Sequence, residues 1–380
     1  MTGERLPIGR RVAYLRAHRK LSQQMLADRL GKSKSWVDKV ERGVRSLERV
    51  STIREVAAVL RVDAATLLGD DARPPGAAER TEGVARIRAA LSTYGMTAGR
   101  DAPPEGLNRA VAHAWNTYRH ARYPQVVEQL PELLAEVQRA QAREPQVGRA
   151  AVVDAYRVAA ALLTKLDETS LAWLAADRAM SAAAGDPVLR ACAAVQLGPV
   201  LRASARARSV LLAAAYRVAP RDLDSGPPGE LSLCGALLVQ AARAGDGRAA
   251  GELLDEAAEL AARVGDGHDH HRTAFGPAAV DVARVAAAVE RGDGAEAVAR
   301  HETAIEADGW RWLPLEQRAA HLVDAARAYL LVGDAEGAAK VLVRAERMAP
   351  AEVGHRPAAR EVVVRLAAVC PSWASTITFQ

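Results

Sequence analysis

The chain has 380 residues, a formal net charge of +5, 49% hydrophobic residues and 4% aromatic residues. Alanine, the best helix former, supplies much of the hydrophobic fraction, so composition predicts an all-α protein of two or three domains. No run approaches the roughly 18 apolar residues of a membrane helix, and the N-terminal "MTGERLPIGRR" has no apolar leader core. We therefore expect a soluble, cytoplasmic protein with no membrane partner.

The positive charge is concentrated at the front of the chain. Residues 1–70 carry 15 lysines and arginines against 8 aspartates and glutamates, and the remaining residues carry 36 against 38. A compact basic domain on a near-neutral body is expected of nucleic-acid binding. A membrane-surface helix is the weaker alternative, because these basic helices lack a large aromatic or leucine face.

Five short helices are predicted in residues 1–69: "IGRRVAYLRAHRK", "SQQMLADRL", "KSWVDKVER", "LERVSTIREVAAVL" and "AATLLG". Ser22 and Ser33 are suited to cap the second and third helices, and Gly31 and Gly43 to end them. The Pro-, Gly- and Asp-rich residues 70–80 read as a linker.

Residues 81–380 show internal repetition. Gly-Asp pairs at 245–246, 292–293 and 333–334 are each followed by small and large apolar residues at helical spacing. The clearest unit runs from Leu322 to Pro350, with small Ala326 and Ala338 where two antiparallel helices would meet. This unit resembles the tetratricopeptide repeat superfamily. The resemblance implies an α-solenoid with a concave face that binds peptides, protein helices or small molecules.

The second and third predicted helices carry small and apolar residues at fixed offsets. With Gln23 as position 1, Ala27, Gly31, Val37 and Val40 fall at positions 5, 9, 15 and 18. A small residue permits the helix crossing, glycine permits the turn, and the two valines anchor the later helix. Residues 6–69 resemble the phage-repressor-like (Xre-type) helix-turn-helix family, a five-helix, lambda-repressor-like domain, although Lys32 stands where that family usually has an apolar residue.

The resemblance implies that the third helix enters the major groove of double-stranded DNA. Base contacts are expected from Lys34, Ser35 and Lys39. Backbone contacts are expected from Gln23, Lys32, Ser33, Trp36, Arg42, Arg45 and Arg10. Two alternatives stay open: Trp36 contacts DNA or packs in the domain, and "KSKSWVDKVER" as a whole could be a solvated helix. Glu41 is expected to form an ion pair inside the domain.

One such domain contacts few base pairs, so we expect a homodimer on a pseudo-palindromic operator. The dimer interface could come from the repeats or from "EGVARIRAALSTYG".

A DNA-binding head joined to a repeat array resembles the peptide-sensing repeat regulators of bacteria. That resemblance implies an effector, either a small molecule or a short peptide, which binds one state of the dimer better than the other. In the repeat frame, the first helix of each pair lines the groove. The predicted lining is mostly apolar with one isolated cation. Its residues are Val323, Arg327, Leu331, Val282, Ala286 and Val289. The alternative is that these residues are helix packing in a closed bundle.

Three polar and aromatic clusters are further candidates for effector contact, with core packing as the alternative for each. They are His271, Arg272 and Phe275; Trp310 and Trp312; and Trp115 and Asn116 with Tyr118. The closely spaced histidines at 268, 270 and 271 do not converge at tetrahedral geometry without distant partners, so no metal and no cofactor are expected.

Cys192, Cys234 and Cys370 are few, odd in number and far apart, which argues against a disulfide framework. Each is expected to be a small buried apolar group. No phosphate loop, nucleophile elbow or His-Glu zinc helix occurs, so no enzyme is predicted. The competing hypotheses are a DNA-tethered scaffold whose repeats bind a protein, which a groove rich in charge or amides would favour, and an enzyme, which would need a converging acid/base pair.

Overall fold

The computed structural model describes residues 8–19, 21–45, 47, 50–60, 77–93, 104–143, 148–201, 204, 206–223, 225–245 and 247–369. These residues contain helices and no strand, which confirms the all-α prediction. The chain divides into two compact units, residues 1–79 and residues 80–380.

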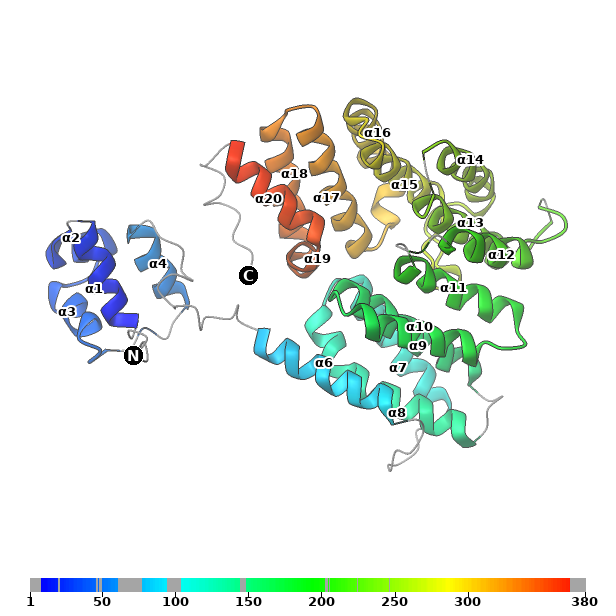
Figure 1. Cartoon of the computed structure of the whole chain (residues 1–380), viewed down its shortest axis with the longest axis horizontal. Coiled ribbons are helices and arrows are strands. Elements are labelled where there is room, and N and C mark those ends of the chain that lie inside the picture. The colour runs from blue at the N-terminus through cyan, green and yellow to red at the C-terminus, as the bar shows by residue number, and fades with distance from the viewer. Residues whose placement is uncertain are drawn as a thin grey trace. The chain divides into compact units, whose positions relative to one another are not determined.

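The first unit contains four described helices, drawn in blue in Figure 1: α1 (Ile8–His18), α2 (Gln23–Leu30), α3 (Lys34–Glu41) and α4 (Val50–Leu60). Their apolar faces form one core, which includes Leu26, Val37 and Leu60. The predicted fifth helix and residues 70–76 of the predicted linker lie outside the described residues. Residues 77–80, predicted as linker, lie in the first turn of helix α6 (Ala77–Ser92).

The second unit is a series of antiparallel helix pairs flanked by α6 and by two terminal helices, α19 (Pro350–His355) and α20 (Pro357–Val369). Two 3₁₀ turns, η1 (His270–Arg272) and η2 (Asp308–Trp312), interrupt the series. The pairs are α7 (Pro104–Arg119) with α8 (Tyr123–Arg143), α9 (Arg149–Lys165) with α10 (Thr169–Ala182), α11 (Pro187–Leu201) with α12 (Ala207–Val218), α13 (Pro228–Arg243) with α14 (Gly247–Val264), α15 (Pro277–Glu290) with α16 (Gly294–Glu306), and α17 (Leu315–Leu331) with α18 (Ala335–Met348).

The Gly-Asp pairs form the turns between helices. Gly292 and Gly333 have φ angles of 78° and 80°, a left-handed conformation that glycine adopts without steric cost. The next residues, Asp293 and Asp334, cap the following helices by accepting hydrogen bonds from backbone N–H groups three residues later. The repeated dipeptide therefore ends one helix and starts the next, as its spacing predicts. Asp246 of the pair at 245–246 lies outside the described residues.

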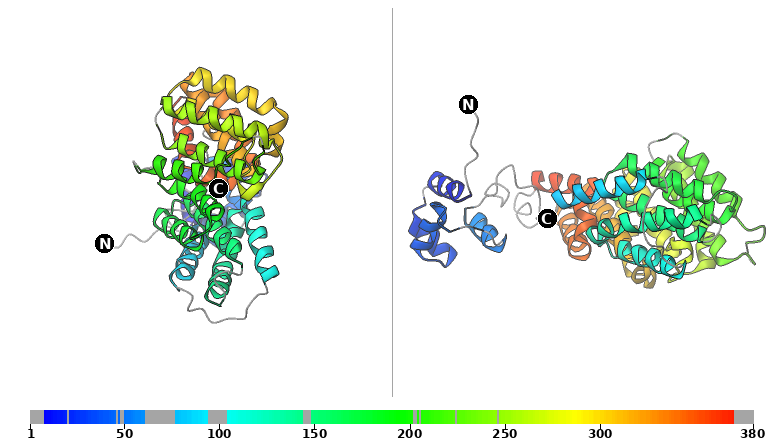
Figure 2. Two further views of the ribbon diagram at one scale, coloured as in Figure 1. Left: turned by 90° about the vertical axis from the view of Figure 1, so that its right-hand side faces the viewer. Right: turned by 90° about the horizontal axis from the view of Figure 1, so that it is seen from below.

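The helix pairs follow one another around an arc that closes on itself (Figures 1 and 2). Each first helix packs against its neighbours along the series, and α17 also contacts α7. Ala319 of α17 and Ala349 share a hydrophobic core with residues of α7, α8, α9 and α10. The first and last helix pairs of the series are thus in contact within the second unit.

Two of the three cysteines are described, and both are buried and unpaired in disulfides. Burial raises the pKa of Cys192 to about 11 and that of Cys234 to about 12, so both stay thiols at neutral pH. This confirms the prediction of small buried groups at these two positions, and Cys370 lies outside the described residues. Among the described helices, none is long and apolar enough to cross a membrane.

Candidate nucleic-acid interface and central cavity

The turn between α2 and α3 is built by the residues that the sequence singled out. Ser22 and Ser33 cap the two helices, and their hydroxyls accept hydrogen bonds from the N–H groups of Met25 and Trp36 at 3.1 Å each. Gly31 has a φ of 60° and ends α2. These local interactions fix the angle at which α3 leaves the turn.

The inner face of α3 is anchored in the core of the first unit. Val37 and Val40 are buried, as is Ala27 on α2. Helix α1 approaches so closely that a Cβ atom on Gly9 would lie 2.0 Å from the carbonyl oxygen of Val40. The predicted anchors are therefore confirmed, and α3 has little freedom to shift.

The opposite face of α3 is exposed. Lys34, Ser35 and Lys39, the predicted base-contacting residues, all lie on it. Five of the predicted backbone-contacting residues are also exposed: Arg10, Lys32, Ser33, Arg42 and Arg45. Arg42 forms an exposed ion pair with Asp38 at 3.4 Å.

Glu41 at the end of α3 is buried in an ion pair within the unit. Its carboxylate accepts hydrogen bonds from Arg16 Nε at 2.5 Å, from Arg16 Nη2 at 3.1 Å and from Gln23 Nε2 at 2.8 Å. The hydrogen bond to Glu41 raises the pKa of Arg16, although burial opposes this shift. The predicted internal role of Glu41 is confirmed. The side-chain amide of Gln23 is occupied inside the unit, and its contact with phosphate stays a prediction.

Trp36 is partly buried and packs against the core of the first unit. This agrees with the alternative in which Trp36 packs within the domain. Its contact with DNA stays a prediction.

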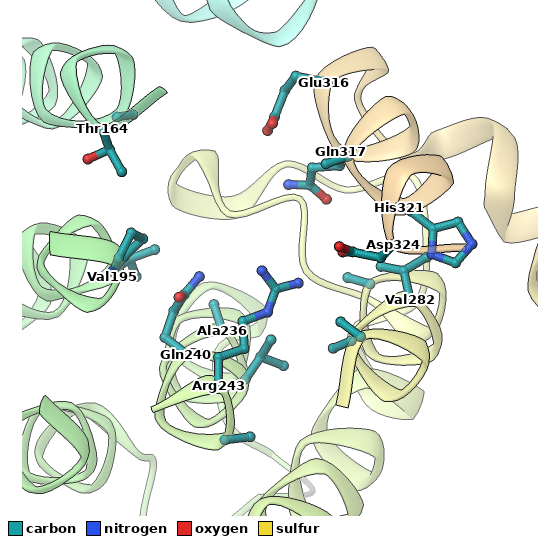
Figure 3. A pocket seen from close by; sticks show the side chains of 18 of the residues that line it. Thr164, Val195, Ala236, Gln240, Arg243, Val282, Glu316, Gln317, His321 and Asp324 are labelled. Carbon is teal, nitrogen blue, oxygen red and sulfur yellow. The ribbon is translucent and has the colours of Figure 1, made fainter. Parts of the chain in front are cut away.

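The second unit contains a cavity of about 930 Å³ (Figure 3). Residues of α7, α9, α11, α13, α15 and α17 line it, together with residues of α19 and α20. The first helix of each pair faces the cavity, as the repeat frame predicts. Seven of the predicted effector-contacting residues meet there: Trp115, Tyr118, Arg272, Phe275, Val282, Ala286 and Arg327.

The other predicted effector contacts do not line the cavity. Val323 is fully buried in the core that α17 shares with α18, and Trp310 is buried in that core as well. Trp312 is exposed, with the Arg311 guanidinium 5.4 Å from its ring centroid. Asn116 is exposed, and His271 contributes its carbonyl oxygen to another contact. Of the remaining two residues in the repeat frame, Val289 is buried in a core and Leu331 is exposed.

The predicted lining of apolar residues with one isolated cation is wrong. The cavity wall carries both carboxylates and cations, many of them paired with one another. Arg327, the expected isolated cation, lies 2.8 Å from Glu290 and 3.8 Å from Asp324. Figure 3 shows polar side chains from α13 and α17, including Gln240 and Gln317, beside apolar Val195 and Val282.

Glu352 of α19 is the centre of a buried polar cluster that joins the first helix pairs to the last. Its carboxylate lies 2.7 Å from Lys165 Nζ on α9 and 2.9 Å from Arg356, and it accepts a hydrogen bond from Tyr123. Lys165 also pairs with Glu316 of α17 at 3.1 Å. Burial alone would raise the pKa of Glu352, but Lys165 and Arg356 outweigh it, so its pKa lies below the ordinary value. We call Glu352, Lys165, Arg356, Glu316 and Tyr123 the closing cluster.

Two arginines hold the histidine-rich loop that contains His268, His270 and His271. Arg157 on α9 is fully buried and donates to Asp154 at 2.6 Å, to Gln196 at 2.8 Å and to the carbonyl of His271 at 2.9 Å. Both terminal nitrogens of Arg119 donate hydrogen bonds to the carboxylate of Asp269. Within the described ranges no group of three or more His, Cys, Asp or Glu residues is arranged to hold a metal ion.

Comparison with known proteins supports the assignment of the first unit. A family model described as a helix-turn-helix domain matches residues 7–68. The first unit is therefore a helix-turn-helix domain, a class of domain that binds DNA with the second helix of the helix-turn-helix motif.

The comparison with solved structures finds PlcR of Bacillus thuringiensis, whose crystal structure holds the peptide PapR7 and DNA. The identity is 11%, the TM-score is 0.33, and the match covers 96% of this chain and 98% of that chain. No curated protein matches the chain.

Proposed function

We propose that this protein is a transcriptional regulator that reads a specific DNA operator with α3 and binds a compact effector in the central cavity. The single observation that carries the DNA-binding part is the fixed pose of α3. Its apolar face is locked against α1 and α2, and Lys34, Ser35 and Lys39 share the exposed face. Lysine donates to guanine O6 and N7, and serine adapts to several bases.

The size of the cavity supports a compact effector. A volume of about 930 Å³ lies within the range of ligand pockets, roughly 300–1,000 Å³. Its boundary includes the closing cluster, in which buried charges neutralise one another. A small molecule or a short peptide fits this space.

The alternative is a DNA-tethered scaffold whose repeats bind a protein partner. Its supporting observation is the polar lining, with the side-chain amides of Gln196, Gln240 and Gln317. Against it, charges of the lining already have partners, among them Arg327 with Glu290 and Lys165 with Glu352, so they offer little to a protein segment. We therefore favour the sensor.

As a regulator of this class, the protein is proposed to act as a homodimer on a pseudo-palindromic operator, because one helix-turn-helix reads too few base pairs to be selective. Analytical ultracentrifugation of the full chain with and without operator DNA tests the dimer.

The DNA-binding proposal is tested by selecting an operator from a random DNA pool and titrating it in a gel shift. Lys34→Ala with Lys39→Ala should weaken binding by about tenfold or more per lost contact, since a base contact is worth about 1–3 kcal/mol. The matched control, Lys340→Ala with Arg365→Ala, removes the same charge from the second unit and should leave affinity unchanged. If both double variants bound the operator with equal affinity, the assignment of base contacts to Lys34 and Lys39 would be wrong.

The effector proposal is tested by thermal-shift screening of metabolites and short peptides with the full chain. A true effector raises the melting temperature, changes operator affinity, and loses both effects in Ala286→Trp, which fills the cavity from α15. Ala299→Trp on the exposed face of α16 is the control. Hits that act equally on both variants would count against the cavity as the sensor site.

A further inference from the structure

Arg272 of the 3₁₀ turn η1 is a cation of the cavity wall that has hydrogen-bond donors to spare. It lines the cavity, and 35% of its side chain is exposed. Its guanidinium lies 3.8 Å from Asp269 and 4.0 Å from Asp154, both beyond hydrogen-bond distance. Among the described residues, its side chain forms no hydrogen bond. An arginine offers five N–H donors in a planar fork whose geometry matches a carboxylate.

Three arginines share two carboxylates at this end of the cavity. Arg157 donates to Asp154 at 2.6 Å, and both terminal nitrogens of Arg119 donate to Asp269. Arg272 has only its long contacts with the same two aspartates. The group therefore carries an excess of one positive charge in a partly buried place, where a charge without a partner is unfavourable. A single negative charge would balance it.

No further carboxylate within the described ranges forms an ion pair with these three arginines. Glu230 lies near enough to act on His271, but it is not within ion-pair distance of them. Burial lowers the pKa of His271, and the neighbouring Arg157 lowers it further, so this imidazole is neutral at pH 7. His271 therefore adds no charge, and the excess of one positive charge remains.

The loop that carries Arg272 is fixed before any ligand binds. His271 and Arg272 have φ angles of 52° and 61°, a left-handed conformation that residues other than glycine rarely adopt. Arg157 donates to the carbonyl of His271 at 2.9 Å, and the hydroxyls of Thr273 and Ser232 lie 2.7 Å apart. Strained residues persist where their surroundings hold them, and they cluster at sites that bind ligands. The backbone of Arg272 is thus held at the cavity wall, which reduces the cost of ordering it on binding.

We propose that Arg272, together with Arg119, binds the carboxylate of a compact, mostly apolar monoanion in the central cavity. The inference rests on the proposed function and names the chemical class of its effector. Arg119 also lines the cavity, and Val195 and Ala236 supply apolar wall for the body of the ligand (Figure 3). Asp269 is the internal competitor, because it already pairs with both arginines.

The experiment uses the full chain and two probes with the same apolar body: 2-naphthoate, which is a monoanion, and 2-naphthamide, which is neutral and has nearly the same shape. Dissociation constants are measured by equilibrium dialysis at neutral pH. Ala286→Trp, which fills the cavity, shows which binding occurs there. Wild type should bind 2-naphthoate about tenfold tighter than 2-naphthamide, because hydrogen bonds between arginine and a carboxylate are charge-assisted.

Two substitutions should move this preference in opposite directions. Arg272→Gln removes the excess charge, so the preference for 2-naphthoate should disappear. Asp269→Asn keeps the size of the side chain and removes the competing charge, so 2-naphthoate should bind about tenfold tighter than to wild type while 2-naphthamide is unaffected. The matched control is Arg311→Gln, which removes an exposed arginine that does not line the cavity and should change neither affinity. Melting temperatures of all variants verify folding.

Each other outcome overturns the inference. Equal binding of the two probes to wild type, a carboxylate preference that survives in Arg272→Gln, or unchanged or weaker binding of 2-naphthoate to Asp269→Asn would each show that these arginines do not select a carboxylate. In those cases 2-naphthamide still reports binding in the cavity, and the proposed function stands. Absence of cavity binding by both probes also overturns the inference, and the thermal-shift screen then decides the proposed function by itself.

Discussion

Replacing Glu352 by glutamine should destabilise the second unit by about 2–3 kcal/mol at neutral pH. The substitution keeps the size of the side chain and its acceptor for Tyr123, and it removes only the negative charge between Lys165 and Arg356. Removing one partner of a buried ion pair typically costs about 3–5 kcal/mol. The lower figure applies because Lys165 retains Glu316 at 3.1 Å and Arg356 retains Asp324 at 3.6 Å.

The comparison variant is Glu316→Gln, which removes one contact of Lys165 at the less buried end of the same cluster. It should cost about 1 kcal/mol. Urea unfolding of the full chain, followed by hydrogen exchange of the peptide that contains α19, reports on the second unit. A loss below about 1 kcal/mol for Glu352→Gln, or equal losses for the two variants, would refute the reasoning.

The pH dependence provides an independent check on Glu352. Because its folded pKa lies below the ordinary value of 4.5, the ionised group contributes stability above that value, and the contribution is lost as the pH falls through the folded pKa. The difference between wild type and Glu352→Gln should therefore be constant near neutrality and shrink below pH 4.5. A difference that grows in acid would reverse the sign and contradict the assignment.

Two glycine substitutions test close approaches in the two units. Gly9→Ala places a Cβ 2.0 Å from the Val40 carbonyl oxygen, so it should abolish operator binding in a gel shift. Gly31→Ala is the comparison: its Cβ meets no atom within 4 Å, so it should lower the free energy of unfolding by only about 1 kcal/mol, because alanine disfavours the left-handed backbone. Gly235→Ala places a Cβ 2.0 Å from the Phe275 ring and should destabilise the second unit by about 1–3 kcal/mol in urea unfolding, a prediction that wild-type stability would contradict.

The helix-turn-helix could be predicted from sequence because all its determinants are local. Ala27, Gly31, Val37 and Val40 lie within 14 residues, and their offsets define both the turn and the buried face. The same reasoning predicted the internal role of Glu41, because an exposed acid there would repel DNA. Its partner Arg16 lies on α1, 25 positions away, and no local spacing points to it.

The cavity was predictable in outline and not in detail. The resemblance to tetratricopeptide repeats places the first helix of each pair at the groove, and Val282, Ala286 and Arg327 do line the cavity. On α17, however, the inward face carries His321 and Asp324, whereas Val323 lies in the core. Where alanine occupies several faces of a helix, hydrophobic periodicity does not distinguish the buried face from the lining face.

The closing cluster lies beyond any reading of local pattern. Lys165 meets Glu316 and Glu352 across 151 and 187 positions of sequence, and Tyr123 meets Glu352 across 229. These contacts exist only because the helix pairs close on themselves. In the sequence each of these residues looks like an ordinary surface group of an alanine-rich helix.

The pairing of charges also changes what a polar lining means. In a groove, unpaired charges and amides would offer a binding surface to a protein segment, and they would favour the scaffold. Here Arg327 is paired with Glu290, and Lys165 with Glu352, so a protein segment would gain little from these charges. Their pairing therefore favours a compact molecule over a protein chain as the occupant.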